Sequence, residues 1–218
     1  MITTAYVDDA WWRGYDYACY RAALGQGLAP MALRLAAAKI PFWVEQTGGF
    51  CMTIGVGLTN DRYIWVTNAR ERIEPDTTVD DLRWYACEYR DDGPDVDREN
   101  TATELTDAGT CQETAAVIAE ELRGSGVDDV TPDVEGSQTL YRDAYAQGLA
   151  PMAVSLTINR VPFTVERPDG DATVLQIPLT PETRLWVTSA GGAYTDETEE
   201  LRWSINLGEP VTTAEALA

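Results

Sequence analysis

Two stretches of the chain, GLAPMALRLAAAKIPFWVE at residues 27–45 and GLAPMAVSLTINRVPFTVE at residues 148–166, are closely similar in sequence. They belong to a longer repeat in which residues 20–69 align without a gap to residues 141–190, each position shifted by 121. The alignment holds 22 identities in 50 positions, far more than chance would give. Such self-similarity indicates that one structural module is used twice in the chain.

The repeated stretch begins with a helical pattern. Pro30 and Pro151 suit the first turn of a helix, where a missing N–H group costs nothing, and apolar residues then recur on one helical face. The second copy also alternates like a strand, with β-branched residues at 154 and 158. Because the first copy is rich in alanine, we predict a helix in both.

Strand patterns follow the helix in both copies. We expect strands at 40–45, 51–57, 63–67 and 82–89, and again at 161–166, 172–177, 184–188 and 201–207. This order predicts an α+β fold, a tandem duplication of a small module in which a helix packs on a three- or four-stranded antiparallel meander. The aromatic residues repeated within the strands are predicted to be buried in the core: Phe42, Trp65, Trp84, Phe163, Trp186 and Trp203.

The repeat also divides the chain into domains. Residues 1–90 are predicted to form the first α+β module, which carries an aromatic N-terminal segment. Residues 91–109 are polar and acidic, and we expect a linker or loop there. Residues 110–218 are predicted to form the second module with an extra leading helix, which begins with a capping box between Thr110 and Glu113 and ends near Gly124.

The formal net charge of −20 is unevenly distributed along the 218 residues. Residues 1–70 carry 5 acids and 6 bases, residues 71–136 carry 20 acids and 5 bases, and residues 137–218 carry 11 acids and 5 bases. A surface with this excess of carboxylates attracts basic grooves and repels nucleic acid itself. We therefore predict an acidic interaction surface that includes Asp80, Asp81, Asp91, Asp92, Asp95, Asp97, Asp128 and Asp129.

Several kinds of catalytic chemistry find no support in the sequence. The chain has no histidine, the commonest general base and a member of most serine and cysteine triads. It contains neither of the familiar glycine-rich nucleotide loops. Its four cysteines lack metal-ligand spacing, and its acidic clusters do not match an EF-hand loop. We expect no cofactor and no metal site, and we favour a non-enzymatic role while leaving an enzymatic one open.

Two further sets of residues are candidate sites. The N-terminal segment holds aromatic residues of the types that dominate interface hot spots, namely Trp11, Trp12, Tyr15 and Tyr17. Charged residues that recur in both copies are candidates for an inter-module site: Arg21, Glu45, Arg142 and Glu166. A pair of carboxylates can perform acid–base chemistry when their pKa values are separated. The alternative is that both glutamates are outward-facing strand residues.

The stretch IPFWVEQTGG at residues 40–49 resembles small acidic proteins of actinobacteria and of their phages and plasmids. Those proteins carry a similar strand and turn after an alanine-rich helix. The resemblance covers the 50 aligned residues of each copy and weakens in the second, where ERPDGD replaces EQTGGF. It implies a phage or mobile-element origin, and it brings no activity and no functional residue with it.

The sequence therefore favours a non-enzymatic acidic interaction protein. We expect it to imitate a nucleic-acid backbone and to occupy a basic host protein, such as a DNA-binding or defence protein, without binding nucleic acid directly. The alternatives are a small ligand-binding protein or enzyme with a site between the modules, and a phage virion component. Because the chain lacks a long apolar run and a signal-like N-terminus, we expect no membrane association and a cytoplasmic location.

Overall fold

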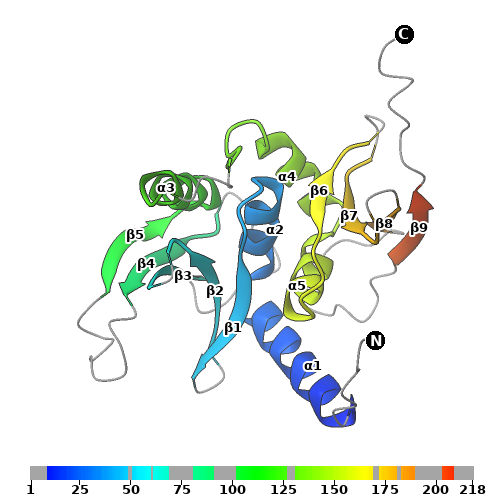
Figure 1. Cartoon of the computed structure of the whole chain (residues 1–218), viewed down its shortest axis with the longest axis horizontal. Helices are drawn as coiled ribbons and strands as arrows, with labels where there is room; N and C mark the ends of the chain where they lie inside the picture. The colour runs from blue at the N-terminus through cyan, green and yellow to red at the C-terminus, as the bar shows by residue number, and fades with distance from the viewer. Residues whose placement is uncertain are drawn as a thin grey trace.

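The structure is a computed structural model that describes residues 9–48, 51–59, 61–68, 81–90, 102–126, 131–168, 172–180, 183–189 and 203–208. Only the backbone is described for residues 9–16, 48, 189 and 203–208. Within these ranges the fold is α+β, with antiparallel sheets, as predicted (Figure 1). Its helices are α1 (Asp9–Gly25), α2 (Ala29–Ala37), α3 (Cys111–Gly124), α4 (Gln138–Ala146) and α5 (Ala150–Ile158).

The strands form two separate sheets. The first sheet has the order β1-β2-β3-β4-β5 and contains β1 (Trp43–Gly48), β2 (Cys51–Gly57), β3 (Arg62–Asn68), β4 (Trp84–Arg90) and β5 (Thr103–Gly109). The second has the order β6-β7-β8-β9 and contains β6 (Thr164–Glu166), β7 (Val174–Pro178), β8 (Arg184–Ser189) and β9 (Trp203–Gly208). We call α1, α2 and β1–β5 the first half, and α4, α5 and β6–β9 the second half.

The two sheets have the same pairing register over their first three strands. Trp43 lies opposite Gly55 as Thr164 lies opposite Gln176, and each pair is related to the other by the shift of 121. The same shift relates all four β2–β3 pairs to the β7–β8 pairs. In both halves, moreover, a pair of helices precedes the sheet.

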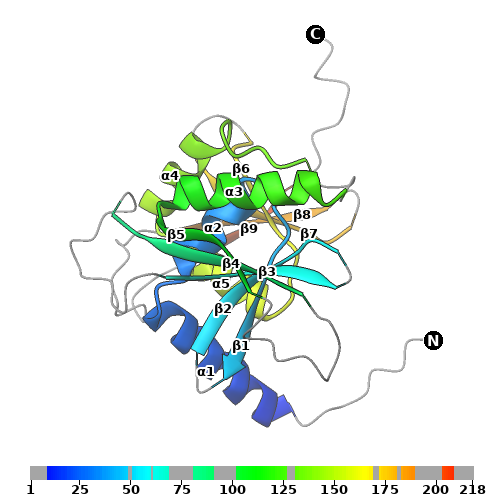
Figure 2. The same cartoon turned by 90° about the vertical axis from the view of Figure 1, so that its left-hand side faces the viewer.

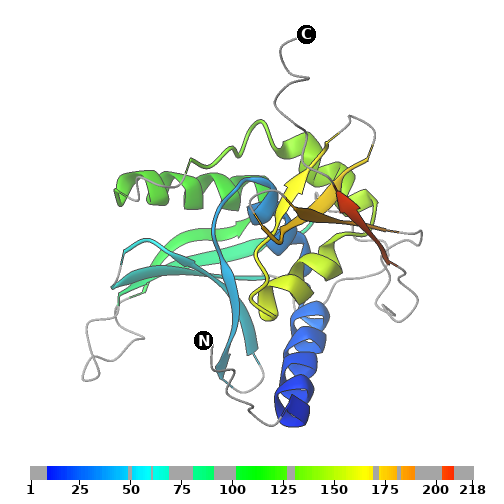
Figure 3. The same cartoon turned by 45° about the vertical axis from the view of Figure 1, so that its right-hand side comes forward.

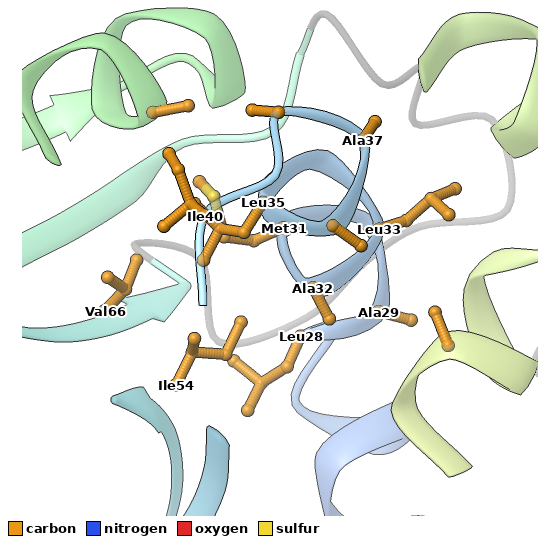
Figure 4. Close-up of a cluster of buried hydrophobic side chains, with 14 of the residues drawn as sticks. Leu28, Ala29, Met31, Ala32, Leu33, Leu35, Ala37, Ile40, Ile54 and Val66 are labelled. Carbon is orange, nitrogen blue, oxygen red and sulfur yellow. The ribbon is translucent and has the colours of Figure 1, made fainter. Parts of the chain in front are cut away.

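Helices α2 and α5 lie side by side at the centre, between the two sheets (Figures 1 and 3). All nine residues of α2 are buried, and all of them except Arg34 are apolar, as expected for a helix packed on every side. Leu28 and Met31 face Ile54 and Val66 of the first sheet, whereas Leu33 points towards α4 and α5 (Figure 4). Contacts between α2 and β6, and between α5 and β1, join each central helix to the sheet of the other half.

Helix α3 lies along β4 and β5 on the side where α2 packs (Figure 2). The predicted capping box is present, because Thr110 Oγ1 accepts a hydrogen bond from the backbone N–H of Glu113 while the Glu113 carboxylate accepts one from the Thr110 N–H. Ile118 and Leu122 of α3 join the same buried cluster as α2 and α5. The buried side chains of both halves thus belong to one core.

Three expectations about the elements need correction. Residues 103–109 are not part of a linker or loop but form β5, which pairs with β4 at the edge of the sheet. Helices α1 and α4 precede the central helices and were not predicted, so each half contributes two helices rather than one. Each central helix also contacts the sheet of the opposite half rather than serving only as the cover of its own sheet.

Four of the predicted aromatic core residues are only partly buried. Phe42, Trp65, Phe163 and Trp186 are all intermediate in exposure. In β3, Ile64 and Val66 point into the core and are fully buried, so alternation places Trp65 on the opposite face of the sheet. Trp84 of β4 was also predicted to be buried, and it is fully buried, whereas only the backbone of Trp203 is described.

Candidate functional site

A groove runs between the two halves, along the segments that lead from the central helices into the sheets. It has a volume of about 540 Å³ and is lined by residues 36, 39–43, 157 and 160–164. Every lining residue of the first half has its counterpart 121 positions later in the lining of the second half. We call it the inter-sheet groove. Its volume lies within the range of pockets that bind small molecules, about 300–1,000 Å³.

The walls of the inter-sheet groove are largely apolar. One wall is formed by Ile40-Pro41-Phe42 and the other by Val161-Pro162-Phe163. The charged residues of the lining are Lys39 and Arg160, and both are exposed. Among the described residues, neither cation has an ion-pair partner.

Lys39 and Arg160 occupy a backbone position that usually belongs to glycine. Their φ values are 59° and 55°, in the left-handed region. Two backbone hydrogen bonds close the end of each helix. In α2 the N–H of Lys39 donates to the carbonyl oxygen of Ala36, and the N–H of Ile40 donates to that of Leu35; α5 ends with the equivalent pair. Helices α1 and α4 end with the same bonding pattern, but there the position is occupied by Gly27 and Gly148.

A second hollow of about 830 Å³ adjoins the groove at the ends of α5 and β1. The two share Trp43, Thr157 and Arg160 in their linings. The other residues of this hollow are more mixed in character: Cys19, Val44, Glu45, Gln46, Met52, Ile158 and Asn159. Together they form a continuous concave surface on which Trp43 stands between an apolar and a more polar part.

The indole of Trp43 is held by a glycine on the neighbouring strand. A Cβ atom built on Gly55 would lie only 2.2 Å from Cε2 of Trp43, so the ring occupies the space that any side chain at 55 would need. Trp43 remains 37% exposed. Thr164 and Gln176 occupy the equivalent positions in the second half, so this arrangement belongs to the first half alone.

The predicted inter-module residues lie at several places. Glu45 lines the second hollow, and its Oε1 accepts a hydrogen bond of 2.7 Å from the indole Nε1 of Trp65. Glu166 is partly buried on β6, and Arg21 and Arg142 are exposed on α1 and α4. Neither hollow is lined by any of these last three, so the two concave surfaces contain Glu45 without a second carboxylate.

Most of the predicted acidic residues fall outside the described part of the chain. Asp81 is described and exposed, just before β4. The others lie outside it: Asp80, Asp91, Asp92, Asp95, Asp97, Asp128 and Asp129. Of the aromatic set, Trp11, Trp12 and Tyr15 lie on α1 with side chains that are not described, and Tyr17 is 57% exposed on the same helix.

Seven exposed carboxylates are described between residues 81 and 136. We call the following residues of β5, of α3 and of the segments before β4 and α4 the acidic face: Asp81, Glu104, Asp107, Glu113, Glu120, Asp133 and Glu135. The exposed bases described between residues 81 and 136 are Arg90 and Arg123. Runs of adjacent aspartates are visible in the sequence, but most of these acids are separated along the chain, so no local pattern in the sequence identifies them as a set.

Several arginines are engaged within the protein. Arg62 donates from Nε and Nη2 to the two carboxylate oxygens of Glu88, at 2.7 and 2.9 Å, and lies 3.9 Å from Glu121. This hydrogen bonding lowers the pKa of Glu88 and raises that of Arg62. Arg167 of the second half pairs with Asp143.

Arg34 is fully buried in the middle of α2. It donates to Ser137 Oγ at 2.9 Å, to Gln112 Oε1 at 2.6 Å and to the carbonyl oxygen of Val134, and its guanidinium lies 5.5 Å from the ring centroid of Tyr141. Burial lowers the pKa of Arg34, because the charged form loses its hydration. Since Arg34 is enclosed by these groups, we infer that its hydrogen bonds hold α2 to the segment that leads into α4.

The described residues hold no group of three or more histidine, cysteine, aspartate or glutamate side chains that could bind a metal ion. All four cysteines are free thiols. None of the helices in the described ranges has the length and apolar character needed to cross a membrane. Comparison of the chain with protein-family profiles, with curated proteins and with solved structures found no match.

Proposed function

We propose that the protein is a non-enzymatic binding protein whose acidic face binds a basic partner. The observation that carries the proposal is the position of the acidic face: four of its seven exposed carboxylates lie on β5 and α3, and the other three lie in the segments just before β4 and α4. Carboxylates on folded elements are held at fixed spacings, so a partner with a rigid basic surface loses little further entropy on binding. Electrostatic attraction of this kind also raises the association rate.

The distribution of the basic residues supports the same proposal. Arg34 is buried, and the Arg62–Glu88 pair lies on the α3 side of the sheet. Arginines used in this way contribute little positive potential to the acidic face. Residues 71–136 carry an excess of 15 negative charges, and such an excess gives this part of the sequence a strongly negative potential.

We place the partner among basic nucleic-acid-binding proteins. A groove that binds DNA presents lysine and arginine side chains to phosphates, and carboxylates on a strand and a helix can take the place of those phosphates. The acidic face repels nucleic acid, so the protein acts on the nucleic-acid-binding protein rather than on the nucleic acid. We place this interaction in the cytoplasm.

We also infer that the two halves arose by tandem duplication. Support comes from the 22 identities at a constant shift of 121 and from the matching strand register of the two sheets. Reciprocal contacts support it as well, because α2 contacts α4 and β6 while α5 contacts α1 and β1. In this account α3 and β5, which carry much of the acidic face, are additions to the first copy.

A matched pair of variants tests the proposed function. The triple variant Glu104→Gln, Asp107→Asn, Glu120→Gln removes three charges from the acidic face, and Glu197→Gln, Glu199→Gln, Glu200→Gln removes three charges from a part of the sequence outside residues 71–136. The binding of a fluorescent arginine-rich peptide is measured by anisotropy at low and at physiological salt. We expect the first variant to bind several-fold more weakly and with a smaller salt dependence, and the second to bind like the wild type. Equal loss in both variants would contradict a localised site.

A further inference from the structure

The two cations of the inter-sheet groove occupy positions that are unfavourable for their residue type. A left-handed backbone costs a residue with a Cβ roughly 1–2 kcal/mol, and glycine avoids this cost. The chain places glycine at the corresponding ends of α1 and α4, namely Gly27 and Gly148, but lysine and arginine at the ends of α2 and α5. Two equivalent sites thus keep a cationic side chain where glycine would fit the backbone better.

The surroundings of these cations define what they can bind. Both line an apolar groove, and neither has an ion-pair partner among the described residues, although the chain as a whole carries a net charge of −20. An unpaired cation beside an apolar wall attracts an anion whose remaining atoms are apolar. A strongly hydrated or cationic ligand would gain nothing from Pro41, Phe42, Pro162 and Phe163.

We propose that the inter-sheet groove binds a carboxylate with an elongated apolar body, the chemical class of a medium-chain fatty acid. The carboxylate pairs with Lys39 or Arg160, and the apolar chain lies between the walls formed by residues 40–42 and 161–163. The chain leaves α2 at the upper end of the helix pair and α5 at the lower end (Figure 1). The two cations therefore lie towards opposite ends of the groove, so the ligand can enter in either direction.

Trp43 makes the two ends unequal. It lines the groove beside Arg160 and is held over Gly55, whereas the equivalent residue beside Lys39 is Thr164. An exposed indole supplies a large, rigid apolar surface for a hydrocarbon chain. This site is distinct from the acidic face, has the opposite charge and does not depend on the proposed function.

Decanoate is the probe that tests the inference, with decyltrimethylammonium as a cation of the same chain length. Binding of each to the full chain is measured by isothermal titration calorimetry below the micellar range. We expect decanoate to bind one to one and decyltrimethylammonium to bind about tenfold more weakly or not at all, since a charge-assisted hydrogen bond is worth about 1.5–3 kcal/mol. Equal affinity for both probes, or no binding of decanoate, would overturn the proposal.

The variant Lys39→Gly, Arg160→Gly separates binding from folding. Glycine suits the backbone at both positions, so the thermal midpoint should stay the same or rise while decanoate affinity falls about tenfold or more. The exchange Lys39→Arg, Arg160→Lys keeps both charges and should retain binding. If the double glycine variant binds decanoate as the wild type does, the two cations serve only the helix ends and the assignment is wrong.

Discussion

At the scale of single residues, the shape of the inter-sheet groove depends on what stands opposite Trp43. The indole of Trp43 fills the space above Gly55. A Cβ atom built on Gly57 would lie 3.8 Å from the same ring, which is an ordinary contact distance. The two glycines on one strand therefore differ sharply in their tolerance of a methyl group. The requirement at position 55 comes from this close approach of a side chain and not from the backbone conformation.

Gly55→Ala is expected to displace the indole and to lower the free energy of unfolding by about 1–3 kcal/mol, the usual cost of overpacking. Urea unfolding measures the change, and binding of decanoate should weaken in parallel if Trp43 forms part of the wall. Gly57→Ala is the matched control and should change stability by less than about 0.5 kcal/mol. If both variants were equally stable, the indole could not be packed over Gly55.

The Arg62–Glu88 pair makes stability depend on pH. The hydrogen bonds from Arg62 hold the pKa of Glu88 below its ordinary value of 4.5. The stabilisation is therefore fully present above pH 4.5 and is lost as the pH falls through the lowered pKa of the folded protein. Glu88→Gln should lower the free energy of unfolding by about 1–2 kcal/mol at pH 7.

The difference between Glu88→Gln and the wild type should shrink as the pH falls below 4.5, because the wild-type carboxyl then becomes neutral as well. Denaturant unfolding at a series of pH values measures this convergence. Glu104→Gln, which alters an exposed carboxylate on β5, is the control and should follow the wild type. A constant difference at every pH would mean that packing, and not the charged pair, stabilises the fold at position 88.

At the scale of elements, helix α3 packs into the core on one side and carries Glu113 and Glu120 of the acidic face on the other. Thr110→Ala removes one side of its capping box and should cost about 1 kcal/mol. Thr110→Ser keeps a hydroxyl group that can accept the same hydrogen bond and should retain most of the stability. Thermal unfolding measures both, and equal stability of the alanine and serine variants would show that the cap does not hold the helix end.

The sequence predicts most elements of the repeat and fails where local patterns are weak. Helices α2 and α5 were predicted because proline at the first turn and apolar periodicity agree. Strand β5, TELTDAG, consists of mostly polar residues without clear alternation, a pattern that predicts a loop, and it forms because it pairs with β4. Helix α1 was not predicted, because its aromatic and charged residues give no clear helical pattern. Its inner face, which includes Ala23 and Leu24, is buried by tertiary packing.

The candidate site was less predictable than the elements. Equivalence of positions 39 and 160 follows from the repeat, but the groove exists only because α2 and α5 pack together and bring the two segments opposite each other. The sequence offset of 121 between the two copies does not tell how the copies are placed relative to each other in space. The one available signal was a lysine and an arginine at the ends of helices where the same repeat elsewhere uses glycine, as at Gly27 and Gly148.

At the scale of the whole molecule, the two halves share one core. Helix α2 is buried by side chains from both halves, and separating them would expose its contacts with α4, α5 and β6. We therefore predict that fragments 1–130 and 131–218, expressed separately, show no cooperative thermal unfolding, and that mixing them restores it. Calorimetry measures both. Cooperative unfolding of either fragment alone would make it an independent domain and would contradict a shared core.

The central claim is that the acidic face, and not another surface, binds a basic partner. The most direct measurement is the change in backbone amide NMR shifts when the labelled full chain is titrated with an arginine-rich peptide. We expect the shifts to be concentrated in β5, α3 and the segments before β4 and α4, and to weaken as salt is raised because the attraction is screened over about 8–10 Å. Shifts confined to α1 or to the inter-sheet groove would contradict it.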